Sequence, residues 1–510
     1  MNSHIVKKIF NILLILLAFS SAIYFFSFIT ADVDLWGHVL FGKEILTSKA
    51  IPLVDPYSYT AYGAKWINHE WVSEVLMYFV FNTFGSPGLL IGKTLIGLVI
   101  IALLSAICFN RKIHPLLYSI VLVVSVFIMS PGFMTRPHIM TFLFTSLFFL
   151  VIHLYLEKRM NILWTLPLIM ILWVNSHGGF VVGAGILPVI TVLEFISCKI
   201  KKKDKSHLRS LILWMLITEA SMLINPYGFN LFVFLFKTLS QPRSISEWNP
   251  VSLFDLSYVR LKIFTICVIL SFFIKRSKNR YWEIGIIIVA MLFTFLHQRH
   301  MPIFAILTAP FLAEKFSGIE EYLRLNEKIS SFYSHLILGI FIALIIGYQL
   351  SVTINKYIKT EFNIIVNPNV YPVRAVRFLK ANSIKGNLLI YFDWGEYAIW
   401  KLYPDNRVSI DGRFRTVYTE DIIMDHFNGE RSQEAWNSLL DKYPTDIVLA
   451  RRNPFSQKMI TVPSDDWIYI YSDNVSIIFL KNSEPMKKVI ERFVDKKLVY
   501  PKDELSIYFP

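Results

Sequence analysis

The chain has 510 residues, of which 54% are hydrophobic and 17% charged, and its mean hydropathy is +0.49. A soluble globular chain does not reach this balance, so the composition excludes the soluble classes and predicts a polytopic membrane protein. The formal net charge of +14 does not indicate nucleic-acid binding, because the basic residues form short clusters between apolar runs, where they set membrane orientation and favour anionic headgroups. These clusters are Arg111-Lys112, 157–159, 199–205 and 275–280.

The first apolar run, residues 9–30, is long enough to span a bilayer, which takes about 20 apolar residues in a helix. Lys7 and Lys8 precede the run and no basic cluster follows it, so the positive-inside bias puts the amino terminus in the cytoplasm. The run is longer than a signal-peptide core and lacks a small-residue cleavage site, so we expect it to remain as an anchored helix. Asp32 and Asp34, which follow the run directly, are then delivered to the outer face of the membrane.

A loop of residues 31–87 follows and contains two amphipathic stretches, each with a tryptophan at its start. They predict two interfacial helices lying in the headgroup layer. Asp34 opens the first helix, and His38 lies one turn later on the same face. His69 and Glu70 open the second helix and would return to the surface near Asp34 if residues 49–67 cross back. Either aspartate could instead only cap its helix, a role that Asp fills well.

Further apolar runs predict, together with the first, about eleven membrane spans. An odd number sends the carboxyl terminus outside, and the short runs 161–175 and 301–313 leave room for one re-entrant pair. The runs are 9–30, 88–109, 116–130, 138–155, 161–175, 179–198, 210–224, 260–274, 283–297, 301–313 and 333–354.

Six basic or imidazole side chains fall in the outer loops between these runs. Such groups could neutralise a phosphate, for which the planar fork of arginine is well suited. Taken singly, each is also explained as a headgroup anchor. The six are Arg136, His138, His177, Arg243, Arg299 and His300.

From about residue 356 the hydropathy drops and no run is long enough to span. Short strands are predicted at 387–392, 446–450, 467–471 and 475–480, with helices around 374–381, 434–440 and 485–493. We therefore divide the chain into a membrane domain, residues 1–355, which carries the outer loop 31–87, and an extracytoplasmic α/β domain, residues 356–510. Within the second domain, stretches 391–397 and 407–414 combine aromatics, acids and arginines, a composition that suits sugars but also strand ends and turns.

The potential metal ligands form no recognised signature. Cys108, Cys198 and Cys267 each lie in or at the end of an apolar run without metal-like spacing to one another, which predicts neither a disulfide framework nor a zinc site. Histidine beside carboxylates could still bind a divalent cation, and the candidate ligands are then Asp34, His69 and Glu70.

The acidic motif after the first span, the two helices of the outer loop and the outward α/β tail together resemble the GT-C superfamily. These membrane glycosyltransferases use polyprenyl-phosphate-linked sugars, as protein mannosyltransferases and lipid A aminoarabinose transferases do. The stretch Asp34-Leu-Trp-Gly-His38 looks like the acidic helix of the family, which implies that Asp34 takes the position of the catalytic base. His69-Glu70 falls where many members carry a polar motif, whereas Leu35 stands where a glutamate often follows the first aspartate.

The predicted function is transfer of a sugar from a polyprenyl-phosphate donor to an acceptor glycan, lipid or protein at the outer face of the inner (plasma) membrane, with inversion. No nucleic acid takes part. One base and positive charge for the departing phosphate suffice for this reaction. Asp34, assisted by Asp32, is the predicted base, and the predicted substrate-binding residues are His38, His69, Glu70, Arg136, His138, His177, Arg299 and His300.

Alternative functions are a polysaccharide polymerase, a flippase for lipid-linked glycans, or a scaffold whose tail binds partners. A polymerase would rely on outer arginines and make the aspartates dispensable. A flippase should carry charged groups deep in its spans, whereas here they gather near the outer rim.

Overall fold

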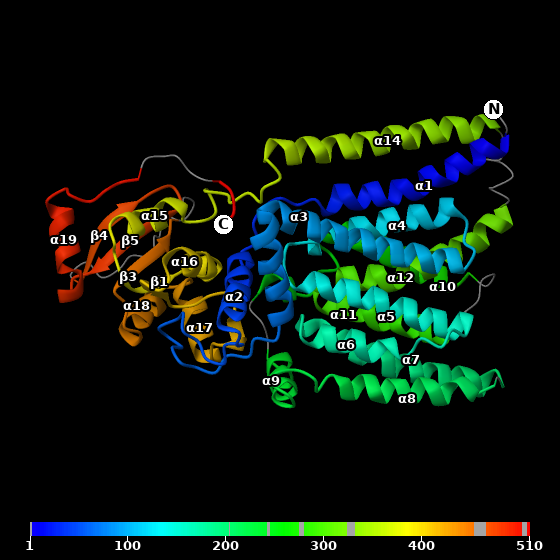
Figure 1. Ribbon diagram of the computed structural model, residues 1–510, viewed down its shortest axis with the longest axis horizontal. Helices are drawn as coiled ribbons and strands as arrows, with labels where there is room; N and C mark the ends of the chain where they lie inside the picture. The colour runs from blue at the N-terminus through cyan, green and yellow to red at the C-terminus, as the bar shows by residue number, and fades with distance from the viewer. Residues whose placement is uncertain are drawn as a thin grey trace. The chain divides into compact units, whose positions relative to one another are not determined.

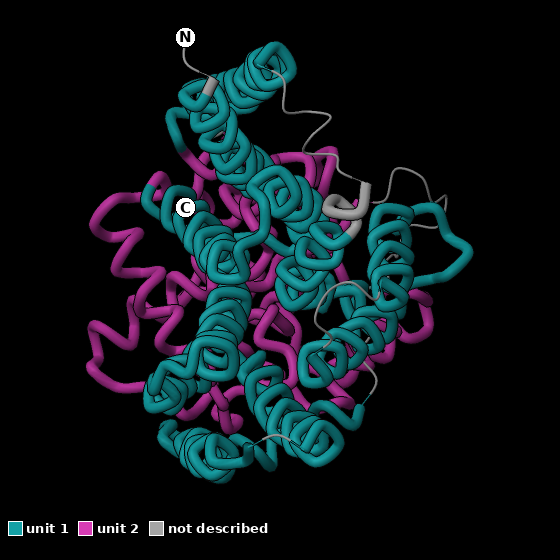
Figure 2. The backbone as a smooth tube through the Cα atoms, turned by 90° about the vertical axis from the view of Figure 1, so that its right-hand side faces the viewer, with its two compact units in different colours: residues 1–28, 88–362 teal, residues 29–87, 363–510 magenta. Residues whose placement is uncertain are grey.

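A computed structural model of the protein describes residues 3–202, 204–241, 245–274, 280–323, 332–452, 466–501 and 507–510. The chain divides into two compact units, which Figure 2 shows in different colours. Unit 1 comprises Met1–Phe28 and Gly88–Phe362, and unit 2 comprises Ile29–Pro87 and Asn363–Pro510.

Unit 1 is helical, and each predicted apolar run falls on a helix. Its helices are α1 (Ser3–Phe26), the second part of α3 (Trp71–Asn110), α4 (Pro115–Met129), α5 (His138–Lys158), α6 (Thr165–Val174), α7 (Val181–Ile200), α8 (Ser206–Ser221), α9 (Asn230–Leu239), α10 (Val259–Phe272), α11 (Tyr281–Leu296), α12 (Met301–Leu323) and α14 (Phe332–Lys359) (Figure 1). Among the described residues, 6 helices are long and apolar enough to cross a membrane, namely His4–Phe26, Trp71–Asn110, Pro115–Gly132, His138–Lys158, Gly178–Ile200 and Phe332–Lys359. The predicted class, a polytopic α-helical membrane protein with an α/β domain at its carboxyl end, is confirmed.

Helix α3 is interrupted where the two units meet in the sequence. Gly85 has a φ of 65°, a left-handed conformation that glycine adopts without a Cβ clash. Pro87 follows two residues later and cannot donate a backbone hydrogen bond to the preceding turn. The residues before the break belong to unit 2, and those after it form the apolar helix of unit 1.

Two arginines of the predicted orientation clusters are buried in an ion-pair network of unit 1. Arg111 Nη1 lies 2.8 Å from Glu283 Oε1 and 3.1 Å from Glu314 Oε2. Arg280 Nε lies 2.8 Å from Glu157 Oε1, and its Nη1 lies 2.7 Å from Glu314 Oε2. The network therefore joins the ends of α3, α5, α11 and α12, and these two charges do more than attract headgroups.

The substitution Arg111→Met should lower the thermal stability of the detergent-purified protein strongly. Removing one partner of a buried pair leaves the other charge uncompensated, at a cost of about 3–5 kcal/mol. The exposed Lys158 provides the control, since Lys158→Met removes a cation from the end of α5 without touching a buried partner. Equal melting temperatures for the two variants would contradict a stabilising role of the network.

Unit 2 is built on a five-stranded sheet in the order β2-β1-β3-β5-β4. The strands are β1 (Gly386–Ile390), β2 (Asn406–Val408), β3 (Ile447–Arg451), β4 (Trp467–Ser472) and β5 (Ser476–Lys481). β1 pairs in parallel with β2 and β3, whereas β5 runs antiparallel to β3 and β4. The helices of this unit are α2 (Leu35–Ser48), the start of α3, α15 (Val373–Ala381), α16 (Gly395–Leu402), α17 (Glu420–Gly429), α18 (Gln433–Lys442) and α19 (Lys487–Val494).

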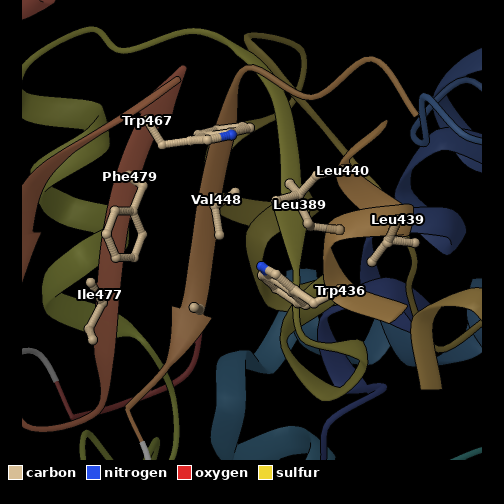
Figure 3. Packing of buried hydrophobic residues seen from close by; sticks show 9 residues of the cluster. Leu389, Trp436, Leu439, Leu440, Val448, Trp467, Ile477 and Phe479 are labelled. Atoms are coloured by element: carbon tan, nitrogen blue, oxygen red, sulfur yellow. The ribbon is translucent and has the colours of Figure 1, made fainter. Parts of the chain in front are cut away.

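Helix α18 covers one face of this sheet. Figure 3 shows Trp436 and Leu439 of α18 beside Leu389 of β1 and Val448 of β3, with Phe479 of β5 in the same buried cluster. Burial of these apolar side chains is the main stabilising contribution to the sheet–helix layer. The four predicted strands are confirmed by their overlap with β1, β3, β4 and β5.

The outer loop 31–87 belongs to unit 2, whereas the sequence analysis assigned it to the membrane domain. Trp36, in the apolar stripe of α2, is fully buried and packs edge-on against Tyr371 and Tyr397, with ring centroids 4.8 and 5.0 Å apart. The loop also extends the sheet edge, because Val408 of β2 donates its N–H to the Tyr57 carbonyl at 3.1 Å. The stripe predicted to face headgroups is thus covered by protein, which a pattern of apolar residues alone does not reveal.

Candidate functional site

The two aspartates before α2 have different local roles. The Asp32 carboxylate accepts the backbone N–H of Asp34 at 3.1 Å, and the Asp32 carbonyl accepts the N–H of Leu35 at 3.2 Å. Asp34 occupies the N-cap position, but its carboxylate makes no capping hydrogen bond to α2. Asp32 therefore stabilises the turn that begins the helix, and the capping alternative does not explain Asp34.

The carboxylates of Asp34 and Glu396 lie together against Gly412. A Cβ placed on Gly412 would lie 2.3 Å from Asp34 Oδ1 and 2.7 Å from Glu396 Oε1. Glu396, in α16, is only 3% exposed, and its Oε2 accepts the N–H of Gly37 at 3.0 Å. Two carboxylates this close repel each other unless protons, cations or hydrogen-bond donors compensate the charge. The fold thus gathers acidic groups from distant parts of the sequence in one small space.

The turn that carries Gly412 is held tightly against the start of α16. A Cβ on Gly395 would lie 2.3 Å from the carbonyl oxygen of Ile410 and 2.6 Å from Cα of Asp411. No other residue type fits such a close backbone approach. This contact positions Glu396, the next residue after Gly395, beside Gly412.

A buried arginine joins this turn to the outer loop. Arg413 donates to Asp55 Oδ1 through Nη1 at 2.7 Å and to both oxygens of Asp411 through Nη2 and Nε, at 2.7 and 2.8 Å. The guanidinium also lies within 4.9 Å of the ring centroids of Tyr57 and Trp66. Burial opposes ionisation of Asp411, but the charge and hydrogen bonds of Arg413 outweigh it, so the pKa of Asp411 lies below its ordinary value.

His38 contacts the second acidic group of the outer loop. Its Nδ1 lies 3.4 Å from Glu74 Oε1 and 3.9 Å from Glu70 Oε2. Burial lowers the pKa of His38, but the hydrogen bond to Glu74 and the charges of Glu70, Glu74 and Asp34 outweigh burial and raise it above the ordinary value. The raised pKa favours the protonated imidazolium, whose positive charge offsets the negative charge of the surrounding carboxylates.

A divalent cation could bind at the same cluster, since ligand atoms of His38, Glu70 and Glu74 all lie within 4.8 Å of one another. The sequence proposed Asp34, His69 and Glu70 as ligands, and of these only Glu70 belongs to the cluster found among the described residues. A cation and a protonated His38 are alternatives, because only a neutral imidazole binds a metal. A bound cation would then offset the negative charge of Glu70 and Glu74 in place of the imidazolium.

Two of the imidazoles predicted to bind phosphate lie side by side in unit 1. The ring centroids of His138 and His177 are 6.3 Å apart. His177 Nδ1 accepts the backbone N–H of Gly179 at 2.9 Å, which leaves the ring proton on Nε2. His138 Nε2 is bonded to the Gly132 carbonyl at 2.6 Å. His177 can therefore offer an N–H to an anionic ligand while His138 is held in place by the backbone.

Arg299 and His300 lie in the turn before α12, against Trp248. The Arg299 guanidinium stacks 4.5 Å from the Trp248 centroid and its Nη1 lies 3.3 Å from Glu247 Oε1. Burial, helped by Arg299 and His297, lowers the pKa of His300 to about 3, so this imidazole is neutral at physiological pH. The charges of Arg136 and Arg299 both interact with His138. The pair His138 and His177 therefore lies near the pair Arg299 and His300 within unit 1.

Sequence reasoning named much of this arrangement but missed its carboxylate partners. Glu396 and Asp411 fall in the stretches 391–397 and 407–414, whose aromatic and acidic composition was the available signal. Glu74 was predicted to belong to the polar cluster of Asn68, His69 and Glu70, with an ordinary solvated position as the alternative, and the structure shows it buried. Arg243 lies outside the residues that the structure describes. His69, with Nε2 3.9 Å from Glu70 Oε1, lies beside the His38 cluster.

No family model matches the chain, and no curated protein sequence matches it. Among solved structures, the chain is similar to ArnT from Cupriavidus metallidurans, whose crystal structure was determined bound to undecaprenyl phosphate. The TM-score is 0.46 and the identity 8%, over 95% of this chain and 99% of that chain. At this TM-score and identity, the likeness does not assign a function to the chain.

The substitution Gly412→Ala should displace the carboxylates of Asp34 and Glu396, because the added methyl would occupy the space into which both point. We expect any activity that uses them to fall at least about tenfold, since small misplacements at a reacting centre are costly. Gly185→Ala is the matched control, because a Cβ there meets no atom within 4 Å. Unchanged activity of Gly412→Ala, measured beside this control, would mean that the acidic pair is not part of the site.

The pH dependence of stability should report the raised pKa of His38. A group whose pKa is higher in the folded than in the unfolded state stabilises the protein below its unfolded pKa, about 6.5 for histidine, and loses this contribution as the pH rises through the folded value. The melting temperature should therefore fall over that range more steeply for the unsubstituted protein than for His38→Gln. The exposed His4 gives the control His4→Gln, which should keep the original slope; an unchanged slope in His38→Gln would refute the assignment.

Proposed function

We propose that the chain is a GT-C-type membrane glycosyltransferase that moves a sugar from a polyprenyl-phosphate donor to an acceptor hydroxyl at the outer face of the inner membrane. The observation that carries the proposal is the carboxylate of Asp34, held at the start of α2 beside Glu396 and over Gly412. A base of this kind suits a donor whose phosphate is already a good leaving group.

The proposed reaction is a single inverting displacement. The acceptor O–H gives its proton to Asp34, the acceptor oxygen attacks the anomeric carbon, and the bond from that carbon to the phosphate oxygen breaks. The polyprenyl phosphate leaves with the bonding electron pair. Glu396, whose Oε2 accepts the Gly37 N–H, lies beside the base, and His38 compensates the local negative charge.

The departing phosphate needs positive charge and N–H donors, and we propose the residues predicted from the sequence for this role. Arg136 and Arg299 supply guanidinium groups, and His177, whose Nδ1 accepts the Gly179 N–H, supplies its Nε2–H. His138 and His300 support this group as neutral rings, and His69 and Glu70 remain candidates for binding the acceptor. A divalent cation at His38, Glu70 and Glu74 would add positive charge near the base.

The substitution Asp34→Asn should reduce sugar transfer by about 10²–10⁴-fold, the usual contribution of a general base. The assay uses the full chain in lipid nanodiscs with a panel of radiolabelled undecaprenyl-phosphate sugars and mixed acceptors. Asp441→Asn, which neutralises an exposed acid of unit 2, should transfer at the unsubstituted rate.

Wild-type transfer that persists in Asp34→Asn would refute the assignment of the base. A polymerase would instead join two lipid-linked glycans in the same assay and tolerate the substitution. A flippase would move the labelled lipid across the bilayer without releasing sugar to any acceptor.

Arg136→Met and Arg299→Met should raise the KM for the donor and lower kcat, because the phosphate gains charge as it departs. The exposed Lys237 of α9 provides the control variant Lys237→Met, for which neither constant should change. A rise in the KM for the acceptor alone would show that these arginines bind the acceptor and not the phosphate.

A further inference from the structure

A separate cluster, where α7 ends and α8 begins in unit 1, brings together a carboxylate, a thiol and an imidazole. Glu194 and Cys198 are one helical turn apart on α7 and share a face, and His207 lies in the first turn of α8. His207 Nε2 lies 3.3 Å from Glu194 Oε1, and Cys198 Sγ lies 3.7 Å from the same oxygen and 3.9 Å from His207 Nε2. All three side chains are largely buried, and Cys198 is fully so.

These separations match the edges of a tetrahedral metal site. Zinc binds thiolate sulfur at about 2.3 Å and imidazole nitrogen or carboxylate oxygen at about 2.0–2.2 Å, so ligand atoms at tetrahedral angles lie roughly 3.3–3.8 Å apart. The three observed distances run from 3.3 to 3.9 Å. The three atoms therefore surround a point from which each can reach one ion with little rearrangement.

We propose that Glu194, Cys198 and His207 bind one Zn²⁺ ion. A thiolate ligand favours zinc and other soft transition metals over Mg²⁺ and Ca²⁺. Thiolate, carboxylate and Zn²⁺ together carry no net charge, which suits a buried site. Water or the carbonyl oxygen of Asp204, which lies 3.8 Å from Cys198 Sγ, completes the fourth position.

The ion would clamp α7 to α8, and a hydrogen bond joins α8 in turn to α5. Glu194 and Cys198 belong to α7 and His207 to α8, while the carbonyl of His207 accepts the hydroxyl of Tyr155 from α5 at 2.8 Å. The basic loop beside the site predicts a cytoplasmic position, where thiols stay reduced and available to metal. The cysteine spacing predicted no zinc site, because that pattern looks for pairs of cysteines and the ligands here are of three different kinds.

The test measures metal bound to the full chain, purified in detergent through an affinity tag without histidines. Elemental analysis should find zinc in the unsubstituted protein, and Cys198→Ser and His207→Ala should each lower the zinc content by about one ion per chain, the stoichiometry of a single three-residue site, whatever the cluster of His38, Glu70 and Glu74 binds. Cys267→Ser, which removes a thiol elsewhere in unit 1, should keep the zinc.

Replacing zinc by Co²⁺ gives a readout that a merely structural role of the residues would not produce. The wild-type protein and Cys267→Ser should show the near-ultraviolet charge-transfer band of a cobalt–thiolate bond. Cys198→His should keep the metal and lose the band, which separates ligand loss from misfolding. A wild-type protein without zinc and without the band, or a band that persists in Cys198→Ser, would overturn the proposal. The cluster would then be an ion pair of Glu194 and His207 beside the buried thiol of Cys198.

Discussion

The buried guanidinium of Arg413 is the interaction on which the organisation of unit 2 depends. It joins Asp55, in the segment that follows the first helix of the chain, to Asp411 in the carboxyl-terminal segment, inside a cage of aromatic rings. A charge this deeply buried is stable only with both partners in place, and removing one partner of such a pair costs about 3–5 kcal/mol. The pairing therefore ties the outer loop to the tail within one unit, close to the turn at Gly412 on which Asp34 and Glu396 lie.

This combination explains why acidic residues gather around α2. Gly395 lets α16 approach the turn at Gly412, and from there Glu396 reaches the start of α2 and accepts the Gly37 N–H, a donor that an N-cap carboxylate would otherwise accept. Asp32 accepts the backbone N–H of Asp34. His38 lies one turn further along α2 and contacts Glu70 and Glu74, at the start of α3. The repulsion between these carboxylates is offset by backbone N–H donors and by the imidazole, an arrangement that stores negative charge where a proton acceptor is needed.

The sequence predicted the helices well, because long apolar runs have few alternatives to a helix in a membrane. It also predicted β1, β3, β4 and β5, whose apolar β-branched runs are distinct, and it brought Asp34, His38 and Glu70 into one hypothesis. It missed β2, α16 and α17, which are short, and it missed Glu396 and Glu74 as partners. Those two depend on pairings between distant segments, such as Asp55 with Arg413, that no local pattern encodes. For the same reason the buried stripe of Trp36 was taken for a membrane-facing one.

The central claim is that Asp34 and Glu396 act as one chemical centre. The most direct measurement is a double-mutant cycle of sugar-transfer rates for Asp34→Asn, Glu396→Gln and the double variant, with the unsubstituted protein as the fourth corner. Residues that work as a unit show strongly non-additive losses, so the double variant should be hardly slower than Asp34→Asn alone. Losses that multiply independently, or a double variant that transfers at the unsubstituted rate, would contradict the claim.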